Sequence, residues 1–333
     1  MSTVSRRQFL CGVGSFGALG VLPTFCFGSA VDVPTNLHKK VEAQVCMGTF
    51  VSITAYNKSK DLLEEALENT FEAARSNERV FTRHSASSPL GVLNTQGKLK
   101  NAPEGIQYLL RQSMQLAKIT DNAFTPASAP VLNLLSEYNV RAITELPKSV
   151  QKDAVRLLDS RNISMDGRTI SLGSSDAGVS LDGIAKGYIV DLLAVTLTQQ
   201  GVTNFLINAG GDIRVGTSLM PDQTWTVGIQ NASNPVSNLQ TLTVAEGAVA
   251  TSGNYESLSS KGYEHIVSGK KGNSLSNDAR CLAVTATAPT CAEADAMATS
   301  LFAMGMEQGT AFLRKHPRYR CVWQMDSGVL IES

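Results

Sequence analysis

One stretch near the C-terminal end restricts the fold more than any other part of the chain: residues 281–300, CLAVTATAPTCAEADAMATS. Its first half is rich in β-branched residues and predicts a strand. A Pro-Thr pair then predicts a turn, and the second half predicts a helix that opens on small residues. The fold must therefore place a strand directly before a helix with small side chains. These small side chains leave space beside the helix for a large group.

Asp295 and Thr299 of this helix are four residues apart, so they share one helical face. A carboxylate and a hydroxyl without large neighbours are hard oxygen ligands of the kind that Mg²⁺ prefers. The alternative is an ordinary helix with a surface Asp and a Thr bonded back to its own main chain. The rest of the sequence decides between these two interpretations.

Charge and composition exclude one class of partner. The chain has 333 residues with 29 basic and 29 acidic side chains, so no net positive field attracts nucleic acid. We therefore expect no nucleic-acid partner. Hydrophobic residues make up 43% of the chain, which is ample for a large core.

The first 30 residues predict a twin-arginine export signal rather than part of the fold. Arg6 and Arg7 are followed by Phe9-Leu10, a weakly apolar glycine-rich stretch and small residues at 28–30 that suit cleavage. We expect residues 1–30 to direct export to the periplasm and residues 31–333 to form one domain. An uncleaved N-terminal anchor, which would tether the protein to the inner membrane, is the alternative.

Hydrophobic periodicity predicts more strands than a simple alternation of strands and helices would contain. We expect an α+β (mixed α/β) fold, a single large domain with antiparallel sheets flanked by helices. A strand entered through a glycine turn is expected at 45–56. Further strands are expected at 204–208, 225–229, 239–244, 247–251, 281–288, 320–323 and 328–331, and a hairpin at 162–172. Helices are expected at 61–80, 105–119 and 185–201, a polar loop at 81–94, and a proline-punctuated segment with a short helix at 123–135.

Four cysteines remain after the predicted signal, and no C-x-x-C pair occurs among them. A zinc knuckle or redox pair is therefore not expected. One or two disulfides in an oxidising compartment and buried free thiols are both compatible with the spacing.

Four glycine-centred motifs follow one another along the chain. They are LDGIAKGY at 181–188, NAGGDIR at 208–214, TSGNYE at 251–256, and His265-Ile-Val followed by a glycine loop. Glycine turns and helix starts present main-chain N–H groups that suit a pyrophosphate. Lys186 adds a positive charge. Together with Asp295 and Thr299, these motifs indicate a site for a phosphorylated ligand with a divalent metal.

This series of motifs resembles the ApbE family of FAD:protein FMN transferases over about residues 47–305. The matching pieces are Met47-Gly-Thr49, the 81–94 segment, 124–134, the lysine motif with Asp191, 208–214, 251–253, His265-Ile266 and 294–299. The resemblance implies binding of FAD and Mg²⁺, and transfer of FMN to a Thr or Ser hydroxyl of an acceptor flavoprotein, with release of AMP.

The resemblance also implies roles for single residues. It makes Asp295, Thr299 and a main-chain carbonyl near Gly183 metal ligands, and it makes His265 and Asp295 catalytic. It assigns flavin-nucleotide binding to Met47, His84, Lys186, Gly210, Gly211, Asp212, Thr251 and Ser252. Ordinary structural roles remain open: Lys186 could pair with a carboxylate, Asp212 could stabilise its turn, and His265 could be solvated.

The chain departs from the family pattern at several positions. His84 stands where an aromatic residue is usual, and Pro89, Thr125, Ser180 and Ser268 stand where acids are usual. These changes remove carboxylates and a stacking ring from the expected pocket. Two alternative functions therefore remain: a metal-dependent FAD pyrophosphatase that yields FMN and AMP, and a non-catalytic FAD-binding accessory protein.

Overall fold

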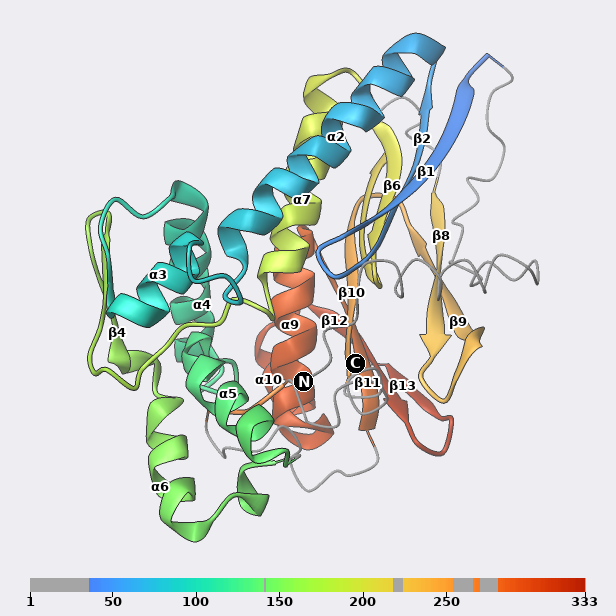
Figure 1. Cartoon of the computed structure of the whole chain (residues 1–333). Helices are drawn as coiled ribbons and strands as arrows, with labels where there is room; N and C mark the ends of the chain where they lie inside the picture. The colour runs from blue at the N-terminus through green and yellow to red at the C-terminus, as the bar shows by residue number, and fades with distance from the viewer. Residues whose placement is uncertain (1–35, 141, 218–223, 254–265, 270–280, 333) are drawn as a thin grey trace.

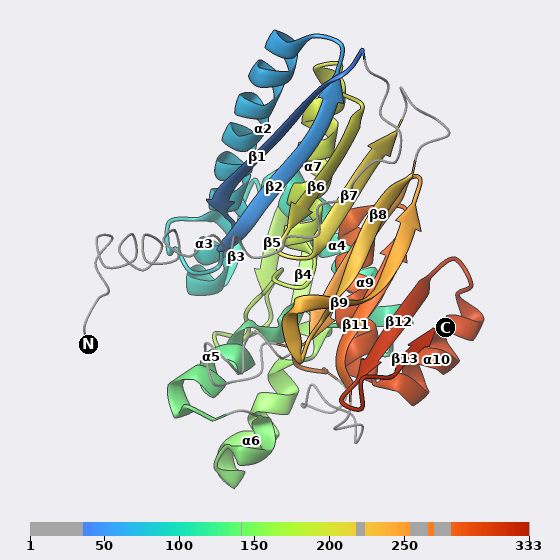
Figure 2. The same cartoon turned by 90° about the vertical axis from the view of Figure 1, so that its right-hand side faces the viewer.

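The structure is a computed structural model that describes residues 36–140, 142–217, 224–253, 266–269 and 281–332. These residues form the predicted mixed α/β fold, with antiparallel sheets flanked by helices (Figures 1 and 2). The segment assigned to an export signal and His265 lie outside the described residues.

The main sheet has eight strands in the order β1-β2-β6-β7-β10-β11-β12-β13. Every neighbouring pair is antiparallel. The strands are β1 (His38–Cys46), β2 (Thr49–Asn57), β6 (Asn204–Ala209), β7 (Asp212–Thr217), β10 (Gly247–Gly253), β11 (Cys281–Ala288), β12 (Arg320–Met325) and β13 (Leu330–Glu332). All six side chains of β6 are buried, as the apolar run predicted.

Three helices lie side by side on one face of this sheet: α2 (Lys60–Phe81), α7 (Ala185–Gln199) and α9 (Cys291–Met304) (Figure 1). The short helix α10 (Met306–Lys315) packs against α9. Helix α9 is buried almost all round, between α7 and strands β10 and β11. Its alanines therefore allow neighbouring elements to approach closely, whereas the sequence suggested free space along much of the helix.

The opposite face of the sheet is covered by the hairpin β8 (Trp225–Asn231) and β9 (Asn234–Val244), which Figure 2 places in front of the sheet. Trp225 and Val227 of this hairpin join a small core with residues of β2, β6, β7 and β10. The sheet is thus buried on both faces near its centre.

Between β2 and β6 the chain builds a second, mainly helical layer, seen at the left of Figure 1. It contains α3 (Pro89–Gln96), α4 (Glu104–Ile119), η1 (Pro126–Ser128), α5 (Ala129–Tyr138), η2 (Ile143–Glu145), α6 (Lys148–Leu157) and η3 (Ser160–Asn162). A three-stranded sheet, β3 (Lys98–Leu99), β5 (Thr169–Leu172) and β4 (Ile163–Asp166), completes it. We call this part the helical lobe.

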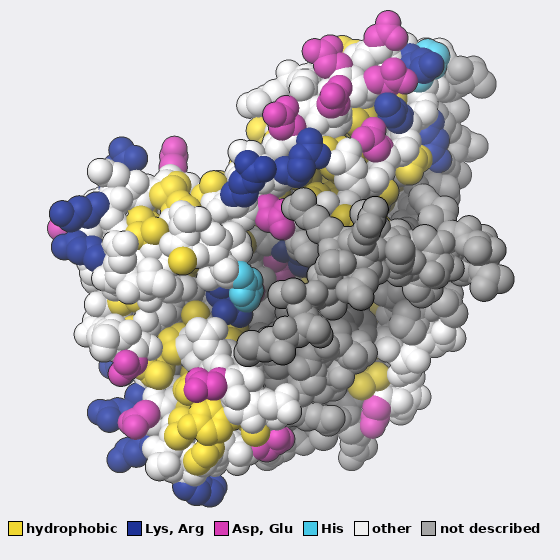
Figure 3. Space-filling model, viewed as in Figure 1, with side chains coloured by type: hydrophobic (Ala, Val, Ile, Leu, Met, Phe, Trp, Pro, Cys, Tyr) yellow, Lys and Arg dark blue, Asp and Glu magenta, His cyan; other side chains and the backbone are white. Residues whose placement is uncertain are grey.

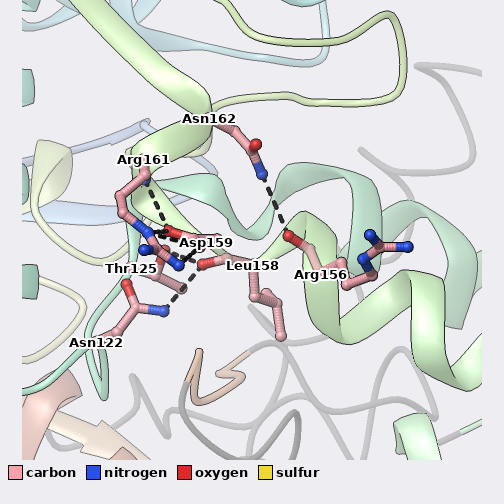
Figure 4. A network of polar contacts seen from close by, with 7 residues as sticks. All are labelled: Asn122, Thr125, Arg156, Leu158, Asp159, Arg161 and Asn162. Atoms are coloured by element: carbon pink, nitrogen blue, oxygen red, sulfur yellow. Dashed lines mark hydrogen bonds and ion pairs between the residues drawn. The ribbon is translucent and has the colours of Figure 1, made fainter.

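A network of polar contacts stabilises the segment of the helical lobe that leads into α5 (Figure 4). The Leu158 carbonyl at the end of α6 accepts hydrogen bonds from Thr125 Oγ1 at 2.8 Å and from Asn122 Nδ2 at 3.1 Å. Thr125 Oγ1 also accepts a bond from the Ala127 N–H at 3.1 Å. The Thr125 hydroxyl therefore has two partners in the scaffold.

Two sequence-based expectations for the N-terminal half need correction. The glycine turn expected within 45–56 is present at Met47 and Gly48, with φ of 55° and 70°, and β2 follows it, but residues 45 and 46 end a separate strand, β1. The predicted polar loop at 81–94 contains the start of α3. Pro89 occupies the first turn of that helix, and Ser88 Oγ caps it by accepting a hydrogen bond from the Gly91 N–H at 2.9 Å.

The four cysteines that follow the predicted signal, Cys46, Cys281, Cys291 and Cys321, are buried, and no disulfide joins them. Burial raises the pKa of the Cys46 thiol to about 11 and that of Cys321 to about 12. Among the described residues, no helix combines the length and the apolar character that a membrane crossing needs.

Candidate functional site

A cavity of about 260 Å³ lies where the helical lobe meets the sheet and its helices. The turn between β1 and β2, strand β10, the start of α7, helix α9 and the segment around η1 all contribute to its wall. Figure 3 shows a hollow near the middle of this face, with acidic and basic side chains visible inside it. The residues that line the cavity include Met47, Thr125, Ser180, Asp182, Gly183, Lys186, Gly210, Thr251, Ser252, Ile266, Asp295 and Thr299.

Helix α9 and strand β10 meet at one wall of the cavity. Thr299 Oγ1 lies 3.0 Å from Ser252 Oγ, which links the two elements by a hydrogen bond. Gly183 packs against the same threonine, since a Cβ added to Gly183 would stand 3.0 Å from Thr299 Cγ2. A glycine at this position therefore brings the main chain next to Thr299.

Three charged side chains form a cluster at the cavity floor, in which the two carboxylates are buried and Lys186 is half-buried. Lys186 of α7 is ion-paired with Asp212 of β7, whose side chain is 1% exposed, and Asp295 lies beside them with 4% of its surface exposed. Asp295 Oδ2 accepts a hydrogen bond from the Gly187 N–H at 3.1 Å. The cluster joins α7, α9 and β7 at one point.

The electrostatics of this cluster favour a cation. Burial, followed by the negative charge of Asp212, raises the pKa of Asp295 well above its usual range. Burial also raises the pKa of Asp212, although Lys186 opposes that change. Burial alone would lower the pKa of Lys186, but the two carboxylates outweigh it and raise that pKa. When both carboxylates are ionised, Lys186 neutralises only one of the two negative charges. An additional cation would therefore stabilise the cluster.

The glycine pair after β6 forms a tight turn at the edge of the cavity. Gly210 and Gly211 have φ of 60° and 97°, which strongly favour glycine. A Cβ on Gly210 would stand 2.5 Å from Thr49 Oγ1, so close packing also requires glycine there. The Gly211 N–H donates to Asn208 Oδ1 at 2.9 Å. Because Gly210 and Gly211 have no side chains, a ligand in the cavity can approach their main chain closely, as in nucleotide-binding loops.

The donors at the α9 wall are compatible with Mg²⁺. They comprise the Asp295 carboxylate, the hydroxyls of Thr299 and Ser252, and main chain at Gly183. Within the described ranges, no cluster of three or more His, Cys, Asp or Glu side chains could hold a metal ion unaided. Mg²⁺ in proteins commonly takes one or two carboxylates and completes its shell with water and substrate phosphates. The donor set therefore suits an ion that arrives with a phosphorylated ligand.

The structure brings most of the sequence-predicted site residues to this one cavity. The lining includes Met47, Gly183, Lys186, Gly210, Thr251, Ser252, Asp295 and Thr299. Asp212 lies beneath the floor, bound to Lys186, and Gly211 belongs to the adjoining turn. His84 is not among the lining residues. His265 lies outside the described residues, although its neighbour Ile266 lines the cavity.

Sequence reasoning missed a second polar group at the cavity mouth. Asp182 lines the cavity, and its Oδ2 accepts from Arg83 Nε at 2.8 Å. Arg83 Nη1 also donates to Asn133 Oδ1 at 3.1 Å. Ser180 Oγ accepts from the Asp182 N–H at 3.1 Å. The family usually has an acid at the position of Ser180, and in this chain Asp182 supplies a carboxylate two residues later. The sequence signal for it was the Asp near the start of the lysine motif.

Comparison with known proteins identifies the relatives of this chain. Residues 47–323 match the ApbE family. A FAD:protein FMN transferase from Vibrio cholerae is 28% identical over 236 residues, covering 69% of this chain and 67% of its own. One from Treponema pallidum is 26% identical over 332 residues, covering 92% of this chain and 86% of its own.

Solved structures agree on the fold. The ApbE protein from Thermotoga maritima superimposes with a TM-score of 0.77 at 21% identity, covering 89% of this chain and 97% of that one. The apo form of the flavinyl transferase ApbE from Pseudomonas stutzeri gives a TM-score of 0.74 at 22% identity, with 90% and 96% coverage.

Proposed function

The chain belongs to the ApbE family, and from this premise we propose that it transfers FMN from FAD to a Thr or Ser hydroxyl of an acceptor protein. The names of its curated relatives, FAD:protein FMN transferase, support this proposal. The observation that carries it is the convergence of Lys186, Asp295 and Thr299 with a bare glycine turn on one cavity. Such a site suits a pyrophosphate with its cation.

In the proposed reaction, the acceptor oxygen attacks the FMN phosphorus. The bond from that phosphorus to the oxygen bridging the two phosphates breaks, and AMP leaves with the bond electrons. A phosphoester forms, and the hydroxyl proton passes to a base. Lys186 is held at the cavity floor by Asp212 and is suited to balance charge on the pyrophosphate. His265 is our candidate base, next to the cavity-lining Ile266.

Mg²⁺ is part of the proposal. Asp295, Thr299 and the main-chain carbonyl near Gly183 would hold the ion, with the Ser252 hydroxyl supporting Thr299. Bound there, it would neutralise negative charge on the pyrophosphate and on the leaving phosphate. The raised pKa of Asp295 supports a role in binding a cation, since a nearby positive charge favours the ionised carboxylate.

The direct test is to incubate the chain without residues 1–30 with FAD, Mg²⁺ and a flavinylation-competent acceptor domain, then measure the intact mass of the acceptor. We expect an added FMN mass with wild type, none with Asp295→Ala, and full addition with Asp159→Ala. Asp159 is a matched control because it pairs with Arg161 on the surface of the helical lobe. Absence of the adduct from wild type with several acceptors would overturn the proposal.

We further propose that the enzyme works in the periplasm after export through the twin-arginine route, and that its acceptor is an exported protein. Arg6-Arg7 and the small residues at 28–30 support this localisation. Replacing both arginines by lysine should leave the protein in the cytoplasmic fraction, whereas wild type should appear in the periplasm or at the inner membrane. Equal distribution of the two proteins would contradict it.

A further inference from the structure

Asp191 lies outside the cavity lining, yet it contacts the helix that carries the proposed metal ligands. Its Oδ1 accepts a hydrogen bond from the Cys291 N–H and its Oδ2 accepts one from the Ala292 N–H, both at 2.9 Å. These are the first two N–H groups of α9, which have no acceptor within their own helix. A carboxylate from α7 therefore caps α9, a position where negative charge also suits the helix dipole.

Asp295 makes the reverse connection. It belongs to α9, and its Oδ2 accepts from the Gly187 N–H in the first turn of α7. Each helix thus supplies a carboxylate to the opening turn of the other. At the crossing the main chains nearly touch, because a Cβ on Gly187 would lie 2.3 Å from the Cys291 carbonyl oxygen. The two caps and this contact leave α9 little freedom to rotate or slide against α7.

Arg214 of β7 extends the connection to the sheet. Its Nε lies 3.7 Å from Asp191 Oδ1, and its Nη1 donates to the Pro289 carbonyl just before α9. The side chains of Asp191 and Arg214 are only 19% and 21% exposed. Arg214 therefore holds both the Asp191 carboxylate and the turn that leads into α9.

We propose that Asp191 is a positioning residue: by capping α9 from α7 it sets the register that presents Asp295 and Thr299 to the cavity. Asp295 stands one helical turn beyond the capped residues and Thr299 one turn further, so a rotation at the cap would move both. This inference rests on the proposed function in one respect, since it takes these two residues as metal ligands. Replacing a hydrogen-bond partner of a metal ligand typically changes metal affinity about 10-fold to 100-fold, and Asp191, which acts through the main chain of α9, is expected to fall at the lower end of that range.

The test compares Asp191→Asn with Thr290→Ala. Thr290 caps the same helix through Oγ1, which accepts from the Glu293 N–H at 3.2 Å, but it does not join α9 to α7. We expect both variants to lose thermal stability. In the metal-free protein, Asp191→Asn should also reduce hydrogen-exchange protection of the Gly187 amide at least about tenfold, because that amide bonds to Asp295, whereas Thr290→Ala should not.

A second readout is the Mg²⁺ concentration that gives half of the thermal stabilisation with FAD present. We expect it to rise about tenfold in Asp191→Asn and to stay within twofold of wild type in Thr290→Ala. If Asp191→Asn does not fold, Arg214→Met should change both readouts in the same direction, by about threefold, because it leaves the two caps in place.

Unchanged Gly187 protection, or equal effects of Asp191→Asn and Thr290→Ala on it, would overturn the positioning role. The outcome for the proposed function is separate. Wild type that transfers no FMN but shows the Gly187 effect would contradict the function and leave the positioning role supported. If wild type transfers FMN while Asp191→Asn matches Thr290→Ala in both readouts, the proposed function is supported and the positioning role is contradicted.

Discussion

Met47 adopts a main-chain conformation that few side chains tolerate, and it does so at the cavity. Its φ of 55° is left-handed, in a two-residue hairpin turn where Asn or Gly is usual. A left-handed residue with a Cβ is less stable by about 1–2 kcal/mol. Strain of this kind often marks a functional position, and Met47 lines the cavity in which we propose that it contacts the flavin ring.

Met47→Asn tests that interpretation. We expect the free energy of unfolding to stay within about 1 kcal/mol of wild type, since relief of the left-handed strain offsets the lost apolar contact. FAD affinity should fall roughly fivefold, as loss of about 1 kcal/mol of binding free energy would produce. Urea denaturation and fluorescence titration with FAD measure the two quantities. Gly167→Ala, which strains the turn of the β4–β5 hairpin, should lower stability and leave FAD affinity unchanged.

Asp295 should make the stability of the metal-free protein depend on pH. Burial and the charge of Asp212 raise its pKa well above the usual value near 4. Between these two pKa values the folded state holds a proton that the unfolded state has released, so this contribution to stability falls as pH rises. In EDTA, the stability of Asp295→Asn minus that of wild type should grow as the pH is raised above the usual carboxyl pKa of about 4. A constant difference would contradict the raised pKa.

Single residues of the site were predictable where a motif fixes both identity and spacing. Asp295 and Thr299 followed from helical periodicity, and Gly210 followed from a glycine pair after a strand. Asp182 and Arg83 were missed because they are 99 residues apart, and no local pattern links them. Thr125 was counted as a lost pocket acid, but its hydroxyl bonds to Leu158, a contact that depends on the packing of α6.

At the scale of elements, the crossing of α7 and α9 is the part of the fold on which the site depends most directly. At Gly187 the two helices approach so closely that a Cβ would stand 2.3 Å from the Cys291 carbonyl oxygen. Gly187→Ala should lower the free energy of unfolding by about 1–3 kcal/mol, since the extra methyl group pushes the helices apart. The same change should abolish FMN transfer by moving Asp295. Val195→Ala, on the exposed side of α7, should change neither by much.

Secondary-structure elements with strong periodicity were predicted well, including α2, α4, α7, α9 and β6. Helix α3 was missed because a proline and small residues read as a loop, although Ser88 and Pro89 begin it in the usual way. Strand β7 was missed because the expected turn was placed at 209–212, whereas the turn is confined to Gly210 and Gly211 and the chain returns as a strand from Asp212. The glycine turn within 45–56 was predicted, but strand β1 before it was missed, and no propensity favours the left-handed methionine in that turn.

At the scale of the whole molecule, the cavity is shared between the helical lobe and the sheet, and Arg83 spans the join. Its side chain is 11% exposed, and its guanidinium donates hydrogen bonds to Asp182 of the lysine motif and to Asn133 of α5. Arg83→Ala should raise the KM for FAD roughly fivefold and lower stability by about 1 kcal/mol, because water screens the half-exposed Asp182. Arg161→Ala breaks an exposed Arg–Asp pair of the same lobe and should change neither. Equal effects of the two variants would argue against a role for Arg83 at the cavity.

The central claim is that one site breaks the pyrophosphate of FAD and delivers the FMN half to a protein hydroxyl. The most direct test is to quantify, in one reaction with FAD, Mg²⁺ and an acceptor, the AMP released and the FMN bound to the acceptor. We predict equal amounts of the two throughout the reaction, and neither product with Asp295→Ala. AMP accompanied by an equal amount of free FMN would instead identify a pyrophosphatase, and FAD that stays bound and intact would identify a carrier; either result would contradict the claim.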